Sequence, residues 1–185
     1  MSIKDDQREK VVERLAGHLL ETGLAKTSLR ELAKAAGVSD RMLLYYFADK
    51  AEVLSAAAIR VADQVARDLD ATLPPGVRLA PGPMIELSAE MTASPQMRRF
   101  MRLWVEMIGA AARQEAPFDT IAAQILANFR TFLMPRLDVP EGTDREALAG
   151  AIIAMVDGLA LIDICSDEAQ SRAIRGALPG LFGGA

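Results

Sequence analysis

The sequence predicts an all-α fold, and three observations support this prediction. Of the 185 residues, 51% are hydrophobic and only 5% aromatic, and alanine, leucine and methionine abound while runs of β-branched residues are rare. This composition favours helix. Apolar residues recur at three- and four-residue spacing through most of the chain. Residues that can cap helices stand before these segments, and no segment alternates polar and apolar residues as a strand would.

The first predicted helix covers residues 4–22, with Val11 and Leu15 on its apolar stripe and Gly23 at its C-terminal end. His18, the only histidine, lies beside that stripe. A metal site needs several ligands, so we interpret His18 as a surface or packing residue.

A second, short helix is predicted to begin at Leu29. Ser28 and Glu31 have the spacing of a capping box, in which each side chain accepts a hydrogen bond from the other residue's backbone. Gly37 follows as a residue that can adopt positive φ just past a helix end. The small side chain of Ala33 allows another helix to cross closely.

A third helix is predicted after a cap at Ser39 or Asp40, with Leu43 on its inner side. Together the two short helices form a helix-turn-helix. Any tight helical hairpin favours the same small residues, so the spacing alone fits packing as well as DNA binding. The aromatic residues at 45–47 and Lys50 favour DNA binding, because hydroxyl and ammonium groups there could contact a duplex backbone.

A fourth helix should run from Asp49 or Lys50 to about Thr72, where Pro74 and Pro75 end it. Beyond the break at 73–83 we expect five helical segments. They cover about 83–93, 95–112 with Ser94 as cap, a segment from Pro117 or Asp119 to about Leu137 with a kink at Pro135, 143–164 with Thr143 and Glu146 as capping box, and 167–179 after a cap at Ser166 or Asp167.

The charge pattern argues against a general polyanion binder, because the net charge is −4. Residues 1–60 hold ten basic and nine acidic side chains, and the remainder holds eleven and sixteen. The single cysteine, Cys165, excludes an intramolecular disulfide and fits a reducing compartment. The N-terminus does not read as a signal peptide, and no uncharged apolar run reaches eighteen residues. We therefore expect a cytoplasmic protein without a membrane partner.

No catalytic residue can be nominated from the sequence. One histidine and one cysteine give no paired metal-ligand spacing, and the chain has neither a glycine-rich phosphate loop nor a G-x-S-x-G motif. We expect no enzyme activity, no metal and no cofactor.

The segment LRELAKAAGVSDRMLLYYFADKAEVL, preceded by one amphipathic helix, resembles the N-terminal domain of the TetR family of bacterial transcriptional regulators. The resemblance covers roughly residues 8–60. It implies a three-helix DNA-binding domain at 1–48, joined by a long helix to an all-helical ligand-binding and dimerisation domain at 49–185. Because the long helix crosses the boundary, it could act as a lever between effector and DNA.

The resemblance also implies which residues contact double-stranded DNA. Backbone contacts fall on Thr27, Ser28, Tyr45 and Lys50, and the recognition helix carries Ser39, Asp40, Arg41, Leu44 and Tyr46. Position 41 is often small in the family and position 44 often tyrosine, so Arg41 and Leu44 depart from the pattern. Arg41 could read guanine, contact phosphate or remain solvated. Asp40 could cap the helix or accept a hydrogen bond from cytosine, and we favour the cap.

Methionine and aromatic residues gather between residues 84 and 132, and helical spacing makes them either plain core or, as the resemblance implies, walls of an effector cavity. In the second case the effector is a small hydrophobic or aromatic molecule. The candidate pocket residues are Met91, Met97, Phe100, Met101, Trp104, Met107, Phe118 and Phe129. Glu106 resembles a polar anchor, but its spacing from Arg98 and Arg102 favours a solvated charged face.

Residues 148–164 are apolar nearly all round, and a helix of this kind needs burial on every side. The run from Val156 to Leu159 resembles the penultimate helix of TetR-like proteins, which implies a four-helix homodimer interface with the last helix. The candidate interface residues are Ile153, Val156, Asp157, Leu159, Ala160, Ile164, Ile174 and Leu178. Asp157 could meet Arg172 or Arg175 there, or anchor a ligand, and we prefer the interface.

These observations together predict a ligand-responsive transcriptional repressor that binds a palindromic operator as a homodimer. The alternative is a helical carrier of apolar ligands, or a protein-interaction module, that uses the helix-turn-helix only for packing. The sequence does not name the effector, the operator, the regulated genes or the number of dimers bound, and activation is as compatible with it as repression.

Overall fold

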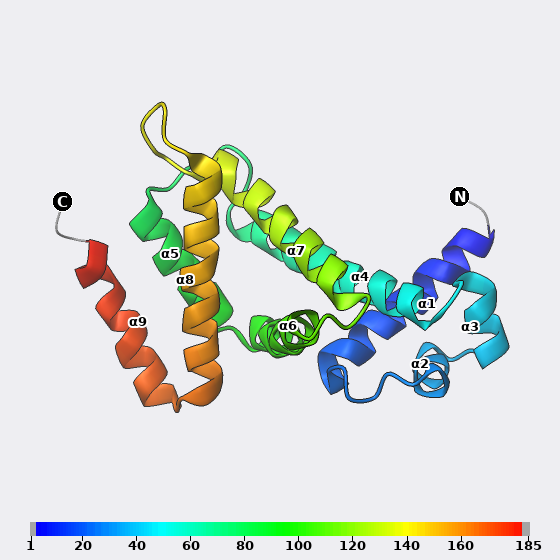
Figure 1. The fold of residues 1–185 in the computed structure, drawn as a ribbon. Helices are drawn as coiled ribbons and strands as arrows, with labels where there is room; N and C mark the ends of the chain where they lie inside the picture. The colour runs from blue at the N-terminus through cyan, green and yellow to red at the C-terminus, as the bar shows by residue number, and fades with distance from the viewer. Residues whose placement is uncertain (1–2, 183–185) are drawn as a thin grey trace. The chain divides into compact units, whose positions relative to one another are not determined.

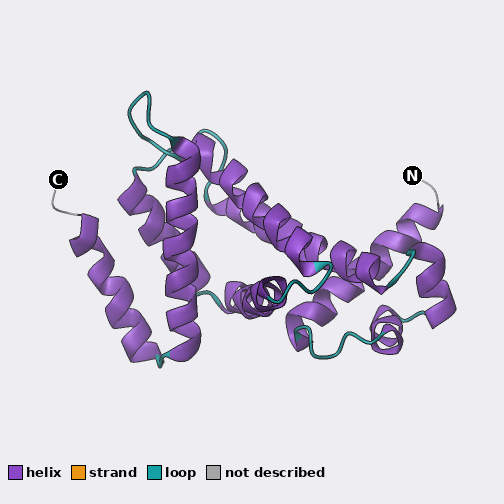
Figure 2. Ribbon diagram, in the orientation of Figure 1, coloured by secondary structure: helices purple, strands orange, loops and turns teal. Residues whose placement is uncertain are grey.

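The computed structural model describes residues 3–182, and its helices confirm the predicted all-α fold (Figure 2). Within that range the only β-type pairing is an isolated bridge between Leu79 and Leu137. The elements are α1 (Ile3–Thr22), α2 (Leu29–Ala36), α3 (Asp40–Tyr46), α4 (Lys50–Thr72), α5 (Pro81–Thr92), α6 (Pro95–Ala112), α7 (Phe118–Leu133), η1 (Met134–Arg136), α8 (Arg145–Cys165) and α9 (Glu168–Phe182), as labelled in Figure 1.

The chain divides into two compact units. The first comprises Met1–Val65 and Arg102–Ile125, and the second comprises Ala66–Met101 and Leu126–Ala185. Helices α4, α6 and α7 therefore each contribute residues to both units. The boundary that we predicted after residue 48 falls inside the first unit and stays a prediction.

In the first unit α1 packs on α2, and α2 packs on α3. The apolar stripe of α1 supplies Leu15 and Leu19 to a core that also contains Leu32, Leu43 and Phe47, all of them buried. This core confirms the predicted inner face of the helix-turn-helix. It also leaves the opposite face of α3 outside, where a partner can reach it.

In the second unit α5 packs against α8 and α9. Its core contains Met84 and Ile85 from α5, Leu137 from the segment after η1, and Ile152 from α8. Leu79 joins the segment after η1 through two backbone hydrogen bonds, one from its N–H to the Arg136 carbonyl (2.9 Å) and one to its carbonyl from Asp138 N–H (2.8 Å).

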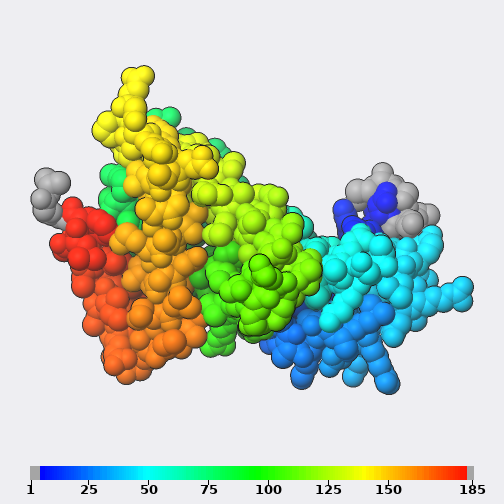
Figure 3. All heavy atoms as spheres, in the orientation of Figure 1, coloured from blue at the N-terminus to red at the C-terminus, as the bar shows by residue number. Residues whose placement is uncertain are grey.

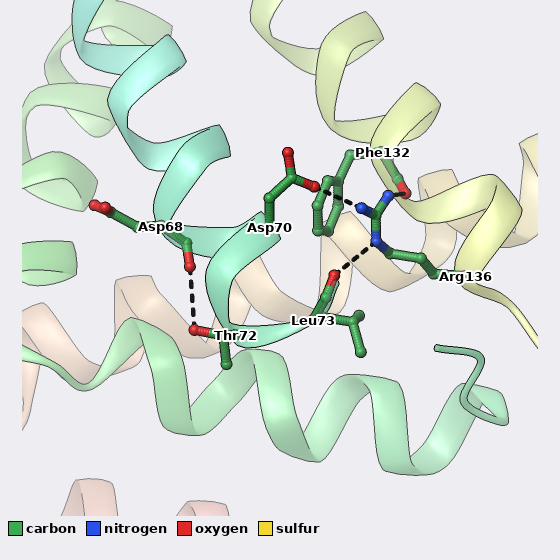
Figure 4. Close-up of polar contacts among 6 residues, drawn as sticks. All are labelled: Asp68, Asp70, Thr72, Leu73, Phe132 and Arg136. Atoms are coloured by element: carbon green, nitrogen blue, oxygen red, sulfur yellow. Dashed lines mark hydrogen bonds and ion pairs between the residues drawn. The ribbon is translucent and has the colours of Figure 1, made fainter. Parts of the chain in front are cut away.

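A buried arginine fastens the last turn of α4 to η1 (Figure 4). Arg136 is 6% exposed, and its guanidinium lies 3.8 Å from the centroid of the Phe132 ring. Its Nε donates to the Leu73 carbonyl (2.9 Å), its Nη1 to the Phe132 carbonyl (2.7 Å) and its Nη2 to Asp70 Oδ1 (2.5 Å). Because each of its three nitrogens donates a hydrogen bond, one of them to a carboxylate, the buried charge has partners.

Three element ends differ from the prediction. Asp144, and not Thr143, caps α8, because its Oδ1 accepts from Ala147 N–H (3.0 Å). The helix after residue 117 ends at Leu133, and Pro135 lies in the short 3₁₀ helix η1. Helix α9 does not stop near Pro179 but continues through it to Phe182. The cap at Asp167 is confirmed by its hydrogen bond from Gln170 N–H (2.9 Å).

Helix α8 is apolar on nearly every side, yet most of it lies on the surface. By length and composition it could span a membrane: its most apolar stretch has a mean hydropathy of 2.1, and 17% of that stretch is buried within the chain. A single such helix is weak support for a membrane protein. In Figure 3, α8 and α9 show as neighbouring orange and red surfaces, so the exposed apolar residues of the two helices can form one face.

Candidate nucleic-acid interface

The start of α2 is fixed by the predicted capping box. Ser28 Oγ accepts from Glu31 N–H (3.3 Å), and Glu31 Oε2 accepts from the Ser28 N–H (3.1 Å) and hydroxyl (2.6 Å). These hydrogen bonds stabilise the carboxylate and hold the pKa of Glu31 below its usual value. The Thr27 hydroxyl donates to the Leu24 carbonyl (2.9 Å). Both hydroxyl protons are therefore engaged within the protein.

The turn between α2 and α3 requires glycine for two reasons. Gly37 has φ = 70°, a left-handed conformation that side chains disfavour. A Cβ there would also lie 2.8 Å from Arg14 Nη1, which donates to the Ala36 carbonyl (2.8 Å) at the end of α2. The turn is closed by hydrogen bonds from Gly37 and Val38 N–H to α2 carbonyls. The predicted helix-turn-helix geometry is confirmed.

Helix α3 begins with Ser39 as its cap, because Ser39 Oγ accepts from Met42 N–H (3.1 Å). The interpretation of Asp40 as the cap is therefore wrong: Asp40 is the first residue of the helix, and its side chain is exposed. Arg41 is exposed as well.

The outer face of α3 is unusually apolar for a surface helix. Met42 is 43%, Leu44 45% and Tyr45 61% exposed, while Leu43 on the opposite face is fully buried. Tyr46 is half-buried and meets the Tyr45 ring edge-on, with the centroids 5.5 Å apart. This face combines apolar groups, which suit thymine methyls, with hydroxyl and guanidinium donors.

Two residues that the sequence analysis missed hold the corner between α3 and α4. The Arg8 guanidinium lies 4.7 Å from the centroid of the buried Phe47 ring, and it pairs with Glu52 (3.4 Å). Glu52 Oε2 accepts from Ala48 N–H (2.6 Å), and Glu52 N–H donates to Asp49 Oδ1 (2.8 Å). The Asp49–Glu52 spacing is a visible capping signal, but nothing local in the sequence connects Arg8 to it.

Lys50 and Arg41 are the two exposed cations among the predicted DNA contacts. Lys50 is the first residue of α4, directly after the corner that Glu52 closes. No hydrogen bond or ion pair within residues 3–182 engages its ammonium group, which leaves all three of its donors available to a phosphate.

The predicted effector-pocket residues are mostly buried. Met97, Phe100, Met101, Trp104, Met107 and Phe118 are each at most 8% exposed, while Met91 and Phe129 are half-buried. Within the second unit the Phe100 and Phe129 rings meet edge-on at 6.1 Å. Burial suits a core and a cavity wall equally, so their role as effector contacts stays a prediction.

Glu106 is exposed, as its spacing from Arg98 and Arg102 predicted. Its Oε2 also accepts a hydrogen bond from Leu24 N–H (2.6 Å) in the turn after α1, a contact that the spacing did not indicate. The preceding residue, Gly23, has φ = 64°, and a Cβ there would lie 2.2 Å from Glu106 Oε1. Only glycine therefore lets the carboxylate of α6 dock in this turn.

The predicted dimer residues fall into three classes. Ile164 and Ile174 are exposed, together with Leu161 and Ile162, which the prediction did not name. The half-buried members are Ile153, Val156, Asp157 and Leu159, while Ala160 and Leu178 are already buried within the chain. The two arginines expected near Asp157 pair with other carboxylates: Arg175 with Asp163, and Arg172 with Glu168 (2.7 Å).

Among the residues that the structure describes, no three histidine, cysteine or acidic side chains gather as a metal site would require. The chemistry that this surface offers is hydrogen bonding, ion pairing and apolar contact. Those are the interactions by which a helix reads a major groove.

Comparisons with known proteins agree with this geometry. Residues 18–57 match the sequence family described as "Bacterial regulatory proteins, tetR family". The HTH-type transcriptional regulator PksA of Bacillus subtilis is 27% identical over 170 residues, covering 85% of this chain and 78% of PksA.

Solved structures share the fold over nearly the whole chain. A TetR-family regulator from Cytophaga hutchinsonii superposes with a TM-score of 0.76 at 21% identity, covering 100% of this chain and 96% of that one. The multidrug binding protein EbrR, solved with proflavin, gives 0.67 at 22% identity and covers 95% of this chain and 99% of its own. The capped helix-turn-helix, the all-α fold and these relatives together show that the chain resembles the TetR family of DNA-binding transcriptional regulators, with the family match lying on residues 18–57.

Proposed function

We propose that this protein is a cytoplasmic, ligand-responsive repressor that binds a palindromic operator as a homodimer. The observation that carries the proposal is the outer face of α3. Met42, Leu44 and Tyr45 are exposed on a helix whose start and end are both fixed by specific contacts. Large apolar side chains on a rigid, accessible helix indicate a binding surface, and the neighbouring cations fit DNA.

The recognition roles follow from the chemistry of each side chain. Arg41 donates to guanine, Leu44 contacts a thymine methyl, and Asp40 accepts from the cytosine amino group now that Ser39 fills the cap. Asp40 otherwise repels the phosphates, so this acceptor role accounts for an acidic residue on the recognition helix. Ser39 and Tyr46 lie at the two ends of this reading face.

Backbone contacts fix the register of the helix on the duplex without reading its sequence. Tyr45 and Lys50 supply them beyond the end of α3. Thr27 and Ser28 supply them at the start of α2, where their hydroxyl protons must leave Leu24 and Glu31 to donate to a phosphate. The exchange makes these two contacts weaker than that of Lys50.

Homodimerisation places two α3 helices in successive major grooves, roughly 34 Å apart. The exposed aliphatic residues of α8 and α9 supply the interface, which also accounts for the membrane-like composition of α8 in a soluble protein. A twofold dimer reads two equivalent half-sites, so the operator is palindromic.

The response to ligand requires an effector that binds the two states of the dimer with different affinities. EbrR is a relative of the same fold solved with proflavin, which supports a small hydrophobic or aromatic effector here. The methionine and aromatic residues of α5 to α7 are the proposed walls. Helix α4 continues from one compact unit into the other, so it is the proposed route by which effector binding lowers DNA affinity.

The first experiment selects binding sequences from random duplexes with the full-length protein. The best sequence is then titrated with wild type, with the double variant Tyr45→Ala and Lys50→Ala, and with Arg78→Ala as an exposed control in the second unit. A palindromic site bound by wild type and Arg78→Ala, but lost in the double variant, is the expected result.

Failure to enrich any sequence would contradict the proposal. It would favour instead a helical carrier of apolar ligands whose helix-turn-helix serves only for packing. Placement of the selected site relative to a promoter then decides between repression and activation in a reporter assay.

A further inference from the structure

The first unit contains a pocket of about 880 Å³ that the sequence analysis did not anticipate. It lies among the turn after α1, the first turns of α4, the last turns of α6 and the loop before α7. This volume is within the range of small-molecule sites. Much of the wall is apolar, with Leu54 from α4, Val105 and Ala110 from α6, and Phe118 from α7. Phe118 is the only predicted effector contact among its described lining residues.

Four charged side chains also line the pocket, and three of them are already engaged. Glu106 accepts the hydrogen bond from Leu24 N–H. Arg113 donates from Nε to Glu115 Oε1 at 2.5 Å. This contact raises the pKa of Arg113 and lowers that of Glu115, as expected for a pair that neutralises itself.

The fourth charge, Lys50, has no such partner in the described part of the chain. The pocket therefore offers apolar walls, the Glu106 carboxylate already held by the Leu24 N–H, and the Lys50 ammonium, which makes no ion pair within the described residues. A ligand that matches the apolar walls and this ammonium group has an apolar body and a single negative head group.

We propose that this pocket binds an amphipathic organic acid, such as a medium-chain or aromatic carboxylate, and that its carboxylate pairs with Lys50. Binding of the acid also has a regulatory role, and this part of the proposal rests on the proposed function in DNA binding. A Lys50 ammonium paired with a bound carboxylate cannot at the same time contact a DNA phosphate. The acid and the operator therefore compete, and each lowers the affinity of the protein for the other.

The pocket also touches the turn that precedes α2. Thr27, a proposed phosphate contact, lines it together with Leu24. The Glu106 carboxylate holds this turn through the Leu24 N–H, and Gly23 allows the close approach. A ligand here thus lies against two DNA-contacting residues at once, with no intermediate helix movement needed.

The test measures ligand binding by calorimetry with the full-length protein in the absence of DNA. The probes are decanoate and 2-naphthoate, with decyltrimethylammonium and decanol as matched cationic and neutral molecules. We expect both acids to bind, and the cation and the alcohol to bind more weakly by roughly tenfold or more.

Three variants locate the site. Lys50→Met should weaken binding of the acids by roughly tenfold or more, and Lys50→Arg should largely retain it. Lys26→Met removes a neighbouring exposed lysine that is not a lining residue, so binding should be unchanged. Gly109→Leu fills the pocket from α6, where an added Cβ meets only Arg113 Nη1 at 3.6 Å. It should abolish binding while the protein keeps its melting temperature and its DNA affinity.

The outcomes separate this inference from the proposed function. Absence of acid binding, equal binding of decanoate and decyltrimethylammonium, or normal binding in Lys50→Met and Gly109→Leu each overturns the site, whatever the DNA selection finds. Binding of the acids without competition by an operator duplex that the protein binds overturns the regulatory role. If the acids compete with the operator duplex for wild type but not for Gly109→Leu, the result supports both the acid-binding site and its regulatory role.

Discussion

Helix α3 and the α8–α9 face both expose large apolar side chains, but different kinds of residue surround these side chains in the two regions. On α3, Met42, Leu44 and Tyr45 stand among Arg41 and nearby hydroxyl groups. On α8 and α9 the exposed residues are aliphatic: Leu161, Ile162, Ile164 and Ile174. The exposed fractions are alike, so exposure alone does not identify the partner. The neighbouring groups support the proposed assignment, because mixed chemistry suits a base-pair edge and large aliphatic side chains suit another copy of the same face.

The two regions also differ in how they are held. The α1–α4 corner is fixed by capping, ion-pair and ring contacts at almost every turn, whereas α8 and α9 are joined chiefly by packing and by the ion pair of Asp163 with Arg175. A surface that must present side chains to a rigid duplex has to be rigid before binding. A surface that pairs with the same surface of a second copy can become more rigid when the dimer forms.

The largest expected effect comes from disrupting the exposed aliphatic residues of α8 and α9. The double variant Leu161→Asp and Ile164→Asp places two charges where α8 should meet its copy. At about 2 kcal/mol for each central contact, the dimer dissociation constant should rise roughly a thousandfold. Sedimentation at several protein concentrations measures this, with Ile108→Asp, also an exposed apolar residue at 40%, as control. An unchanged mass in the double variant would remove α8 from the interface.

A smaller effect sharpens the reading of α3. Arg41→Ala should cost about 1–3 kcal/mol on the selected operator and little on scrambled duplexes, because only a base contact carries discrimination. Lys50→Ala should weaken binding to both duplexes alike and reduce the salt slope by about one. Titrations at several salt concentrations separate the two. Equal effects of both variants on cognate and scrambled DNA would show that Arg41 does not read bases.

A third prediction tests how firmly the turn between α2 and α3 is fixed. Gly37→Ala forces a side chain into positive φ and against Arg14, so the free energy of unfolding should fall by about 1–2 kcal/mol or more. Gly142 is a matched control, since it has φ = 86° but nothing within 4 Å of an added Cβ. Urea unfolding should show a larger loss for Gly37→Ala than for Gly142→Ala. Equal losses would mean that Arg14 yields freely.

The smallest expected effect concerns the capping box. Because the hydrogen bonds to Ser28 lower the folded-state pKa of Glu31, its carboxylate adds stability above its unfolded pKa, near 4.3. That stability is lost as the pH falls through the lower, folded-state value. Glu31→Gln should therefore lower the melting temperature slightly at pH 7 and leave it unchanged near pH 2. A difference that persists in acid would show that the carboxylate charge is not the cause.

Local signals predicted the elements well, because capping depends on residues three or four apart. Ser28 with Glu31, Gly37, and Ser94 before Pro95 could each be recognised without knowing the tertiary structure. Where two capping residues stand side by side, the sequence analysis favoured the wrong one: Asp144, and not Thr143, caps α8, and Ser39, and not Asp40, caps α3. Pro179 was expected to end its helix, because a proline removes a hydrogen bond and crowds the preceding turn, but the helix continues past it to Phe182.

Contacts between distant residues could not be predicted in this way. Glu106 meets Leu24 across 82 positions, and Arg136 meets Asp70 across 66. Each depends on how complete helices pack, which the charge spacing along a single helix does not reveal. The family resemblance supplied the residues of α3 but offered no signal for Arg8, whose role depends on the ring of Phe47.

The hydrogen bonds of Arg136 with Leu73 and Asp70 hold the C-terminal end of α4. Helix α4 has 23 residues, which makes it about 35 Å long, and Lys50 stands at its other end. A tilt of about 5° around the C-terminal end would carry Lys50 by about 3 Å, close to the 3.4 Å rise between neighbouring base pairs. Under the proposed function, a tilt of this size would shift the proposed phosphate contact of Lys50 by nearly one nucleotide.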